Sequence, residues 1–342
     1  MANLASTEIR KAIAKAEGNF ASAENREGSN ATTKLLFANE GSAFQNVKAM
    51  KQSLVQPTEA ILQKKSAITL VGAKSASHSG SVGDSFASTI TYTQKSAKFS
   101  VSYKLAENNL FGYQEQLQQR MFDAMSSLRG GINAYGIAQL AALKTQVTAG
   151  SGLLTWDGTN FKYTNATGAT NVVKQASRIK AIARLNKYGG ALDIIGGQQL
   201  VSDMVHSSAQ GTANETNYGY QFSGLSLAEE EGIDESTLGA NGFGYVIPSG
   251  LVGMTSWNEG INRNGQGEVG TSEGLFTTIA DPIIPNLRYD VHVKRGLADT
   301  VAGSTTFYQD VVDQYEVTAI YSFSHAMIST TNETPIFAFE QK

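Results

Sequence analysis

The sequence predicts a mixed α+β fold with one very long helix and long C-terminal strands. Apolar residues recur with a spacing near 3.6 over residues 107–147, which indicates a helix with one buried face. Residues 287–293 and 312–323 alternate instead between apolar and polar side chains, which is typical of strands that bury one face. With 342 residues, the chain has the length of two ordinary domains.

The long helix is expected to connect two regions. A continuous helix of this length spans about 60 Å at 1.5 Å per residue, which exceeds the width of a compact domain. Asn108 or Asn109 is expected to cap its start. Gly130, Gly131 and Gly136 lower the helix propensity, so we expect them to mark a bend or the close approach of another element.

A lysine-rich β-hairpin is expected before this helix. Residues 86–104 alternate in the manner of two strands, with a turn at residues 94–96. The segment 64–104 carries six lysines and a single acid, Asp84. An isolated two-stranded hairpin is only marginally stable in water, so we expect this one to lie on another surface, and the excess of lysine favours an acidic one.

The N-terminal segments are predicted to form an arm. Residues 1–20 have the pattern of a short basic amphipathic helix. Residues 21–46 are rich in small and polar residues and are expected to be extended or loosely ordered. Residues 47–65 have mixed character, with a break at Pro57.

Short elements are expected between the long helix and the long strands. A loop over residues 148–168 precedes a helix that ends near Tyr188, where Gly189 and Gly190 are expected to supply a left-handed stop. Residues 207–240 form an acidic segment with almost no periodicity. The remaining short elements are a helix at 198–206 and strands at 192–195, 245–247, 276–279 and 335–339, the last as an edge strand because Pro335 is tolerated there.

Charge is scarce and is sorted along the chain. Charged residues make up 17% of the sequence, against about 25% in typical proteins. The net charge of −3 combines +11 over residues 1–187, −9 over residues 188–262 and −5 over residues 263–342. A sparsely charged surface keeps free monomers apart poorly. This composition favours a chain that is packed against other chains. The charge split indicates contacts between copies or a nucleic-acid face, or it has no functional meaning because the segments mix in the folded protein.

Several classes of protein are excluded by what the sequence lacks. It has no cysteine, no apolar stretch long enough to cross a membrane, and no secretory signal pattern. Its four histidines lack the spacing of metal ligands. GQGEVG at residues 265–270 matches a dinucleotide-binding pattern, but turn residues flank it where that motif needs a strand and a helix. We therefore predict no catalytic, cofactor or metal site and no enzymatic activity.

The order of these elements resembles the major capsid proteins of tailed bacteriophages, which have the Hong Kong 97-like fold. The resemblance rests on a basic arm, a lysine-rich hairpin, the helix LAENNLFGYQEQLQQRMFDAMSSLRGGINAYGIAQLAALKTQV, the unit RIKAIARLNKYGGALDIIGGQQL, and the strands LRYDVHVKRG and DQYEVTAIYSFSHAM. It covers nearly the whole chain. The resemblance implies an N-terminal arm, an extended β-hairpin loop, a spine helix, a peripheral-domain sheet and an axial domain. The corresponding segments are 1–61 for the arm, 62–106 for the extended loop, 107–167 and 276–342 for the peripheral domain with spine helix 107–147, and 168–275 for the axial domain.

The resemblance also implies a function. Copies of the chain would assemble as hexamers and pentamers into an icosahedral shell around double-stranded DNA, with scaffold, portal or decoration proteins as further partners and no membrane. The virion is the expected location, after assembly in the host cytoplasm. The candidate contacts between subunits are Lys64, Lys65, Lys74, Lys95, Lys98 and Lys104, and the acidic residues Glu229, Glu230, Glu231, Asp234 and Glu235. The residues expected to meet DNA through non-specific phosphate contacts are Arg10, Lys11 and Lys15.

Three alternatives remain open from the sequence. An encapsulin shell has the same fold, and its cargo enzyme distinguishes it from a shell that packages DNA. A soluble enzyme or ligand-binding domain that uses the insert 207–275 predicts activity in a monomer. A tail tube subunit is disfavoured by the long helix, because such subunits consist mostly of short strands.

Overall fold

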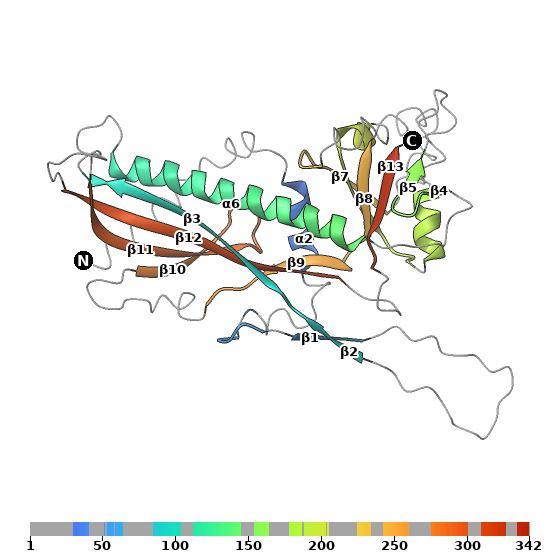
Figure 1. Ribbon diagram of the computed structural model, residues 1–342, viewed down its shortest axis with the longest axis horizontal. Coiled ribbons are helices and arrows are strands. Elements are labelled where there is room, and N and C mark those ends of the chain that lie inside the picture. Colours follow the sequence, from blue (N-terminus) through green and yellow to red (C-terminus); the bar gives the residue numbers. More distant parts are fainter. Residues whose placement is uncertain are drawn as a thin grey trace, which may run out of the picture.

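The computed structural model has the mixed α+β architecture that the sequence predicts. It describes residues 30–40, 51, 53–57, 59–63, 85–103, 112–144, 154–163, 178–186, 188–202, 204, 224–233, 242–259, 275–299, 309–325 and 334–341. A long helix, α6, lies along a five-stranded sheet, and a six-stranded sheet stands beyond the C-terminal end of the helix (Figure 1). A separate pair of short strands lies below the five-stranded sheet in this view, with α6 above the sheet.

Helix α6 spans Tyr113–Leu143 and, at 31 residues, is about 46 Å long. Gly112 precedes it in an extended conformation, and the Glu115 carboxylate accepts the N–H of Gly112 at 3.1 Å. This bond satisfies one of the donors that a helix start leaves unpaired. The predicted cap at Asn108 or Asn109 is therefore wrong. The described helix begins at Tyr113 after Gly112, and Asn108 and Asn109 lie outside the described residues.

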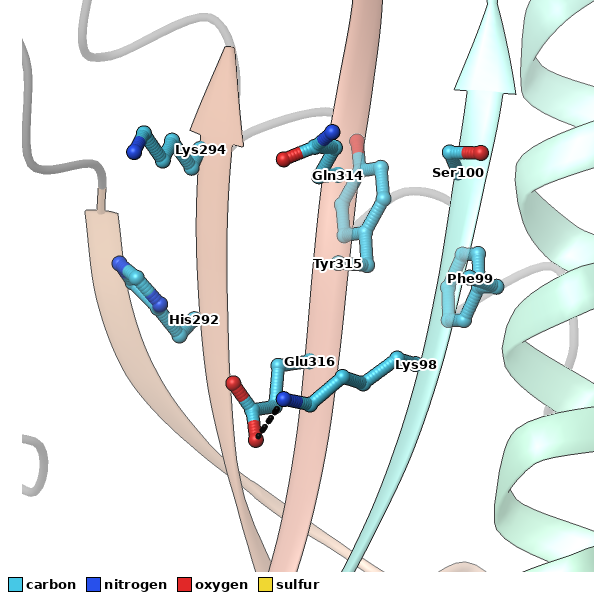
Figure 2. Close-up of a pocket in the computed structure, with 8 residues that line it drawn as sticks. All are labelled: Lys98, Phe99, Ser100, His292, Lys294, Gln314, Tyr315 and Glu316. Carbon is cyan, nitrogen blue, oxygen red and sulfur yellow. Dashed lines mark ion pairs between the residues drawn. The ribbon is translucent and has the colours of Figure 1, made fainter. Parts of the chain in front are cut away.

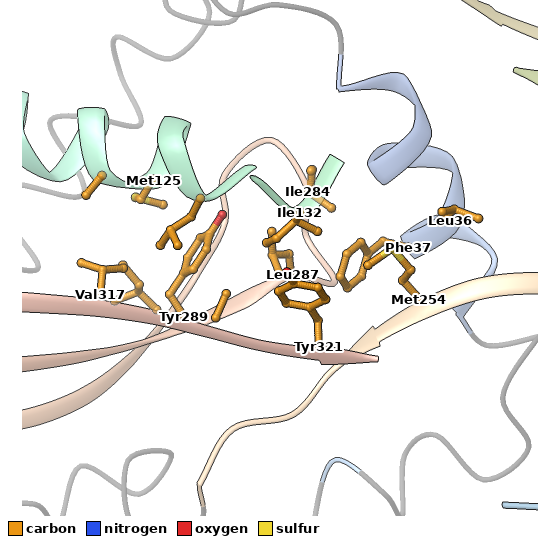
Figure 3. Packing of buried hydrophobic residues seen from close by; sticks show 14 of the residues in the cluster. Leu36, Phe37, Met125, Ile132, Met254, Ile284, Leu287, Tyr289, Val317 and Tyr321 are labelled. Atoms are coloured by element: carbon orange, nitrogen blue, oxygen red, sulfur yellow. The ribbon is translucent and has the colours of Figure 1, made fainter. Parts of the chain in front are cut away.

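One face of α6 is buried against the five-stranded sheet. The buried residues recur every three or four positions, as the sequence pattern indicated. Met125 and Ile132 lie above Tyr289 and Val317 of the sheet and above Leu287 just before β11, which Figure 3 shows from close by. Apolar burial of this kind contributes roughly 1.5–3 kcal/mol for each large side chain, and it makes this layer the larger of two cores.

The five-stranded sheet is antiparallel. Its path runs β10 (Leu275–Ala280), β11 (Arg288–Asp299), β12 (Gln309–His325) and β3 (Tyr92–Ser102), and β9 (Val252–Ser256) pairs with the end of β12. The two long strands were expected from their alternation. Tyr315, Val317 and Ala319 of β12 are buried on the face toward α6, and Gln314 and Glu316 alternate with them on the other face.

The predicted hairpin is wrong in its pairing. No turn occurs at residues 94–96, because β3 runs through them as one continuous strand and pairs with β12 from Tyr92 to Ser102. The preceding strand β2 (Ser85–Thr89) does not pair with β3 either. It pairs with β1 (Glu59–Gln63) in a separate two-stranded ribbon. Alternation along one strand does not identify the neighbouring strand, so the prediction from the sequence gave β3 the wrong partner.

The six-stranded sheet combines segments from three distant parts of the chain. Its order is β4 (Thr155–Trp156), β5 (Phe161–Tyr163), β13 (Phe337–Gln341), β8 (Phe243–Pro248), β6 (Leu192–Gly196) and β7 (Leu225–Glu229). The predicted edge position of the last strand is wrong, since β13 pairs with β5 on one side and β8 on the other. Pro335 lies before the strand begins and so breaks no ladder bond. The C-terminal strand thus shares a sheet with strands of segment 168–275.

The sequence missed the short elements that tertiary contacts create. Helix α2 (Ala31–Ala38) lies within the segment expected to be extended, and it buries Leu36 and Phe37 beside α6 and β9. Strands β1, β4, β5, β7 and β9 were also missed, because two to five residues are too few to show a period. The expected helix before Tyr188 is helical over residues 178–185. Gly189 and Gly190 are not in the left-handed region, because the positive-φ glycines of the described residues are Gly158, Gly224 and Gly250.

Candidate inter-subunit contact site

The lysines predicted to form contacts fall into two groups. Lys95 and Lys98 lie on β3. Lys64, Lys65, Lys74 and Lys104 lie outside the described residues, as do the predicted DNA-facing residues Arg10, Lys11 and Lys15.

Lys95 makes a contact within its own chain. Its side chain crosses to α6, where Nζ donates to the carbonyl oxygen of Gly131 at 2.9 Å. A Cβ added to Gly131 would lie 3.1 Å from this Nζ. Because Gly131 has no side chain, it leaves room for the side chain of Lys95. The expected close approach of another element to the helix glycines is therefore confirmed at Gly131.

Lys98 lines an open polar groove on the face of the sheet that points away from α6 (Figure 2). The groove has a volume of about 480 Å³ and runs across β3, β12 and β11. Register places Lys98 beside Glu316, and Glu316 beside His292. Lys98 Nζ lies 3.4 Å from the Glu316 carboxylate, and its side chain is 73% exposed. A surface ion pair of this kind contributes at most about 1 kcal/mol.

The second row of the groove is formed by Ser100, Gln314 and Lys294, which stand side by side on three strands. Because Lys98 and Glu316 offset one another, Lys294 adds one formal positive charge to the groove. Small-molecule sites are usually more enclosed, so an open groove on a sheet face is better suited to contact with another macromolecule.

The acidic residues separate into buried and exposed ones. Glu229 and Glu231 are exposed at the end of β7, whereas Glu230 between them is fully buried. Asp234 and Glu235 lie outside the described residues. The prediction of an inter-subunit role for Glu230 is wrong, because its carboxylate is used inside the chain.

Glu230 caps helix α2 from a distant loop. Its Oε2 accepts the backbone N–H of Thr32 at 2.9 Å and the Thr32 hydroxyl at 2.8 Å. Its Oε1 accepts Asn133 Nδ2 of α6 at 2.9 Å and the N–H of Gly232 at 3.1 Å. Asn133 Oδ1 in turn accepts both donors of Thr33. A carboxylate at a helix start satisfies unpaired N–H groups and interacts favourably with the helix dipole.

A buried ion pair was not anticipated from the sequence. Arg129 of α6 and Asp281 of the loop after β10 are both fully buried and lie 2.8 Å apart. The sequence did contain a signal for this pair, because Arg129 lies four residues after Met125 on the apolar face of the helix. A charged residue at such a position is rarely fully buried unless it has a partner. The partner itself lies 152 residues away in the sequence.

The strands β1 and β2 form a two-stranded ribbon that pairs with neither of the larger sheets. Figure 1 shows the ribbon extending away from the body of the molecule at the base of β3. An isolated ribbon of two strands is marginally stable in water, and no strand of the two larger sheets pairs with this one.

Within the described residues, no three potential metal ligands come together, and no helix is long and apolar enough to cross a membrane. GQGEVG lies outside the described residues.

Comparisons with known proteins identify the fold. No family model matches the sequence, and no curated protein matches it. The structure is similar to a solved structure of Mycobacterium phage Che8, with a TM-score of 0.50 at 8% sequence identity over 89% of this chain and 90% of that chain. Lower TM-scores relate it to the cyanophage Pam1 capsid asymmetric unit (0.45, 9% identity, 89% of this chain and 92% of that chain) and to a virus-like particle from Pyrococcus furiosus (0.40, 10% identity, 90% and 97%).

At such identities the likeness concerns the fold. The Che8 likeness extends over nearly nine tenths of the chain. It confirms the resemblance drawn from the sequence, and the chain has a Hong Kong 97-like α+β fold.

Proposed function

We propose that this chain is a major capsid protein, which assembles into the icosahedral shell that encloses the double-stranded DNA of a tailed bacteriophage. The observation that carries the proposal is the Hong Kong 97-like fold. The role is structural and involves no catalysis. In this proposal the protein is assembled in the host cytoplasm and is located in the virion.

The proposal assigns the parts of the fold to the parts of a capsid subunit. Helix α6 with the five-stranded sheet corresponds to the spine and peripheral domain, and the six-stranded sheet to the axial domain. The β1–β2 ribbon corresponds to the base of the extended loop, and the residues before it to the N-terminal arm. The ribbon supports this assignment, because it pairs with neither large sheet of its own chain and needs a surface to lie on.

The partners follow from the same assignment. Copies of the chain form hexamers and pentamers, whose contacts repeat around rings. Arg10, Lys11 and Lys15 of the arm meet packaged DNA through non-specific phosphate contacts. Scaffold, portal and decoration proteins are further partners of such a shell.

The test is the state of the purified chain. Sedimentation and negative-stain microscopy of concentrated protein, alone and with the neighbouring gene products of its source genome, should show shells, tubes or capsomers. Particles purified from the source should contain double-stranded DNA. A compact monomer under every condition would contradict the proposal, and particles filled with a cargo enzyme would identify a nanocompartment shell instead.

A further inference from the structure

A cluster of polar side chains lies where the end of α6 meets the six-stranded sheet (Figure 1). Lys144 follows the last residue of the helix, Asn160 lies just before β5, and Glu340 lies on β13. Asn160 and Glu340 are buried, and Lys144 is partly buried. Three separate elements thus bring an amine, a carboxamide and a carboxylate together with little access to water.

The carboxamide of Asn160 lies between the other two groups. Lys144 Nζ donates to Asn160 Oδ1 at 2.9 Å, so Nζ lies within about 4 Å of the carboxamide carbon Cγ. On the other side, Asn160 Nδ2 donates to Glu340 Oε2 at 2.8 Å. The amine therefore faces the carbonyl of the carboxamide, while the carboxylate holds the amino group that would leave if Cγ were attacked.

Lys144 is better suited to act as a nucleophile than an ordinary surface lysine. An amine attacks carbon only in its neutral form, which burial favours. Burial lowers the pKa of Lys144, and the charge of Lys162 lowers it as well, against the opposing charges of Asp157 and Glu340. At a given pH, a larger fraction of Lys144 is therefore neutral than of a fully exposed lysine.

The neighbouring Lys162 lacks this arrangement. Its Nζ lies 2.5 Å from Glu340 and 3.2 Å from Asp157, both of which are carboxylates. Burial alone would lower the pKa of Lys162, but these two partners raise it. A protonated amine is no nucleophile, and a carboxylate resists attack because of its negative charge. Lys162 thus serves as a counter-charge, which leaves Lys144 as the amine that can react in this cluster.

We propose that Lys144 Nζ attacks Asn160 Cγ and forms an amide bond between the two side chains, with release of ammonia. The bond between Nζ and Cγ forms, and the bond between Cγ and Nδ2 breaks. Glu340 takes the proton that Nζ loses and passes it to the leaving Nδ2. The neutral amine and the carboxamide thus give a secondary amide and ammonia, without an oxidant or a further reactant. The reaction occurs once in each chain, so it involves no enzymatic turnover, and it does not require assembly.

The bond has a structural consequence. It closes a ring of residues 144–160 and ties the end of α6 covalently to the residue before β5. A cross-link that closes a ring restricts the unfolded chain and so stabilises the folded one. The junction between the long helix and the six-stranded sheet would then be held by a covalent bond in addition to side-chain packing.

The test is the mass of the full chain after purification. The unmodified chain should be lighter than its sequence requires by one molecule of ammonia. Trypsin should then release residues 130–162 as one peptide, because an acylated Lys144 resists cleavage, whereas a chain without the bond yields 130–144 and 145–162. Chymotrypsin can cut after Trp156, inside the ring, and this second cut should leave the two pieces joined.

Three variants separate the roles of the side chains. Lys144→Arg keeps the positive charge and a donor but cannot form the amide, so it should keep its full mass. Lys162→Arg is the matched control and should lose ammonia as the unmodified chain does. Glu340→Gln cannot carry the proton and should lose ammonia at least about tenfold more slowly. Circular dichroism checks that all variants fold.

Two results would overturn the bond. One is a full mass, with two separate tryptic peptides, for the unmodified chain after prolonged incubation at neutral pH. The other is an equal loss of ammonia from Lys144→Arg, which would place the reaction at a different asparagine. Neither result bears on the capsid function, because particle assembly is measured separately.

Discussion

Arg129 of helix α6 donates through Nη1 to the Oδ2 of Asp281 at 2.8 Å, and both side chains are completely buried. The same Oδ2 accepts the hydroxyl of Tyr289 at 2.7 Å. The other carboxylate oxygen accepts the N–H groups of Ile283 and Ile284, each at 2.8 Å. The pair thus fixes the loop between β10 and β11 against the middle of the long helix.

Removal of the arginine is expected to be costly. Arg129→Met leaves the Asp281 carboxylate buried without a counter-charge, which should lower the free energy of unfolding by about 3–5 kcal/mol. Urea denaturation of the unassembled chain measures this loss. Arg120→Met is the control, because Arg120 is exposed on the same helix and its replacement should change stability by no more than about 0.5 kcal/mol. Equal losses in the two variants would show that the buried pair has no special role.

Glu230 is expected to act as the cap of α2. Glu230→Gln turns one acceptor oxygen into a donor that faces the donors of Thr32 or Asn133, so the free energy of unfolding should fall by about 1–3 kcal/mol. Glu229→Gln and Glu231→Gln serve as controls, since both side chains are exposed. Hydrogen exchange should show faster opening of α2 in the Glu230 variant alone. Unchanged exchange in α2 would refute the capping role.

Two glycines of α6 should respond differently to the same change. A Cβ at Gly136 would lie 3.3 Å from Leu36 Cδ1 and 3.4 Å from Thr32 Cγ2, both in buried residues of α2. At Gly130 it would meet no atom within 4 Å. Gly130→Ala should therefore stabilise the protein by about 0.5–1 kcal/mol through helix propensity, while Gly136→Ala should lose this gain to crowding.

The comparison can be made by thermal or urea unfolding of the two alanine variants. We expect Gly136→Ala to be less stable than Gly130→Ala by about 1 kcal/mol or more. Equal stability would mean that α2 can move away from α6 without cost.

The ionic cluster beside β5 predicts a pH dependence. Lys162 Nζ lies 2.5 Å from Glu340 and 3.2 Å from Asp157. Burial alone would raise the pKa of Asp157, but the N–H groups of Asn160 and Thr159, together with Lys162, outweigh this effect and hold its pKa below the usual value. A carboxyl with a lowered pKa in the folded state stabilises the fold above its unfolded pKa. This stabilisation is lost as the pH falls through the folded pKa.

The stability difference between the unmodified chain and Asp157→Ala should therefore be largest near neutral pH and shrink as the pH falls below about 4. Denaturation at a series of pH values measures it. Lys162 behaves in the opposite direction. Burial would lower its pKa, but hydrogen bonds to Glu340 and Asp157 raise it, so its contribution is present below its unfolded pKa and is lost as the pH rises through the folded one. A difference that stays constant over this acid range would contradict the assignment for Asp157.

The β1–β2 ribbon should be needed for assembly but not for folding of the separate chain. Ile61 stands opposite Ala87 in the ladder, and Ile61→Pro removes a backbone donor and disrupts the pairing. Because the ribbon pairs with neither large sheet, the free energy of unfolding should change by less than about 0.5 kcal/mol. The yield of particles should fall sharply. Ile61→Val keeps the backbone donor and should assemble normally, whereas normal assembly of the proline variant would show that the ribbon is dispensable.

The sequence predicted the large elements better than their partners. The long helix and the strands β6, β11 and β12 were expected, because each is long or apolar enough to show its own period. The expected helix began six residues too early, and the expected β11 ended six residues too soon. β3 was recognised as a strand yet assigned to a hairpin, and β13 was expected at an edge. Both errors concern pairing, which alternation does not report.

The candidate contact residues divide in the same way. Composition identified a lysine-rich segment and an acidic one, but it treated Glu230 and its neighbours as alike. Burial distinguishes them, since Glu230 is fully buried and Glu229 is exposed.

The sequence by itself determined the periodic elements, the sorting of charge and the class of fold, because these properties are encoded in spacings of a few residues or in composition. Only the tertiary structure decided which elements meet. Glu230 lies 198 residues from the Thr32 that it caps, and Arg129 lies 152 residues from Asp281. Contacts over such separations depend on how the whole chain packs, so no local sequence pattern predicts them.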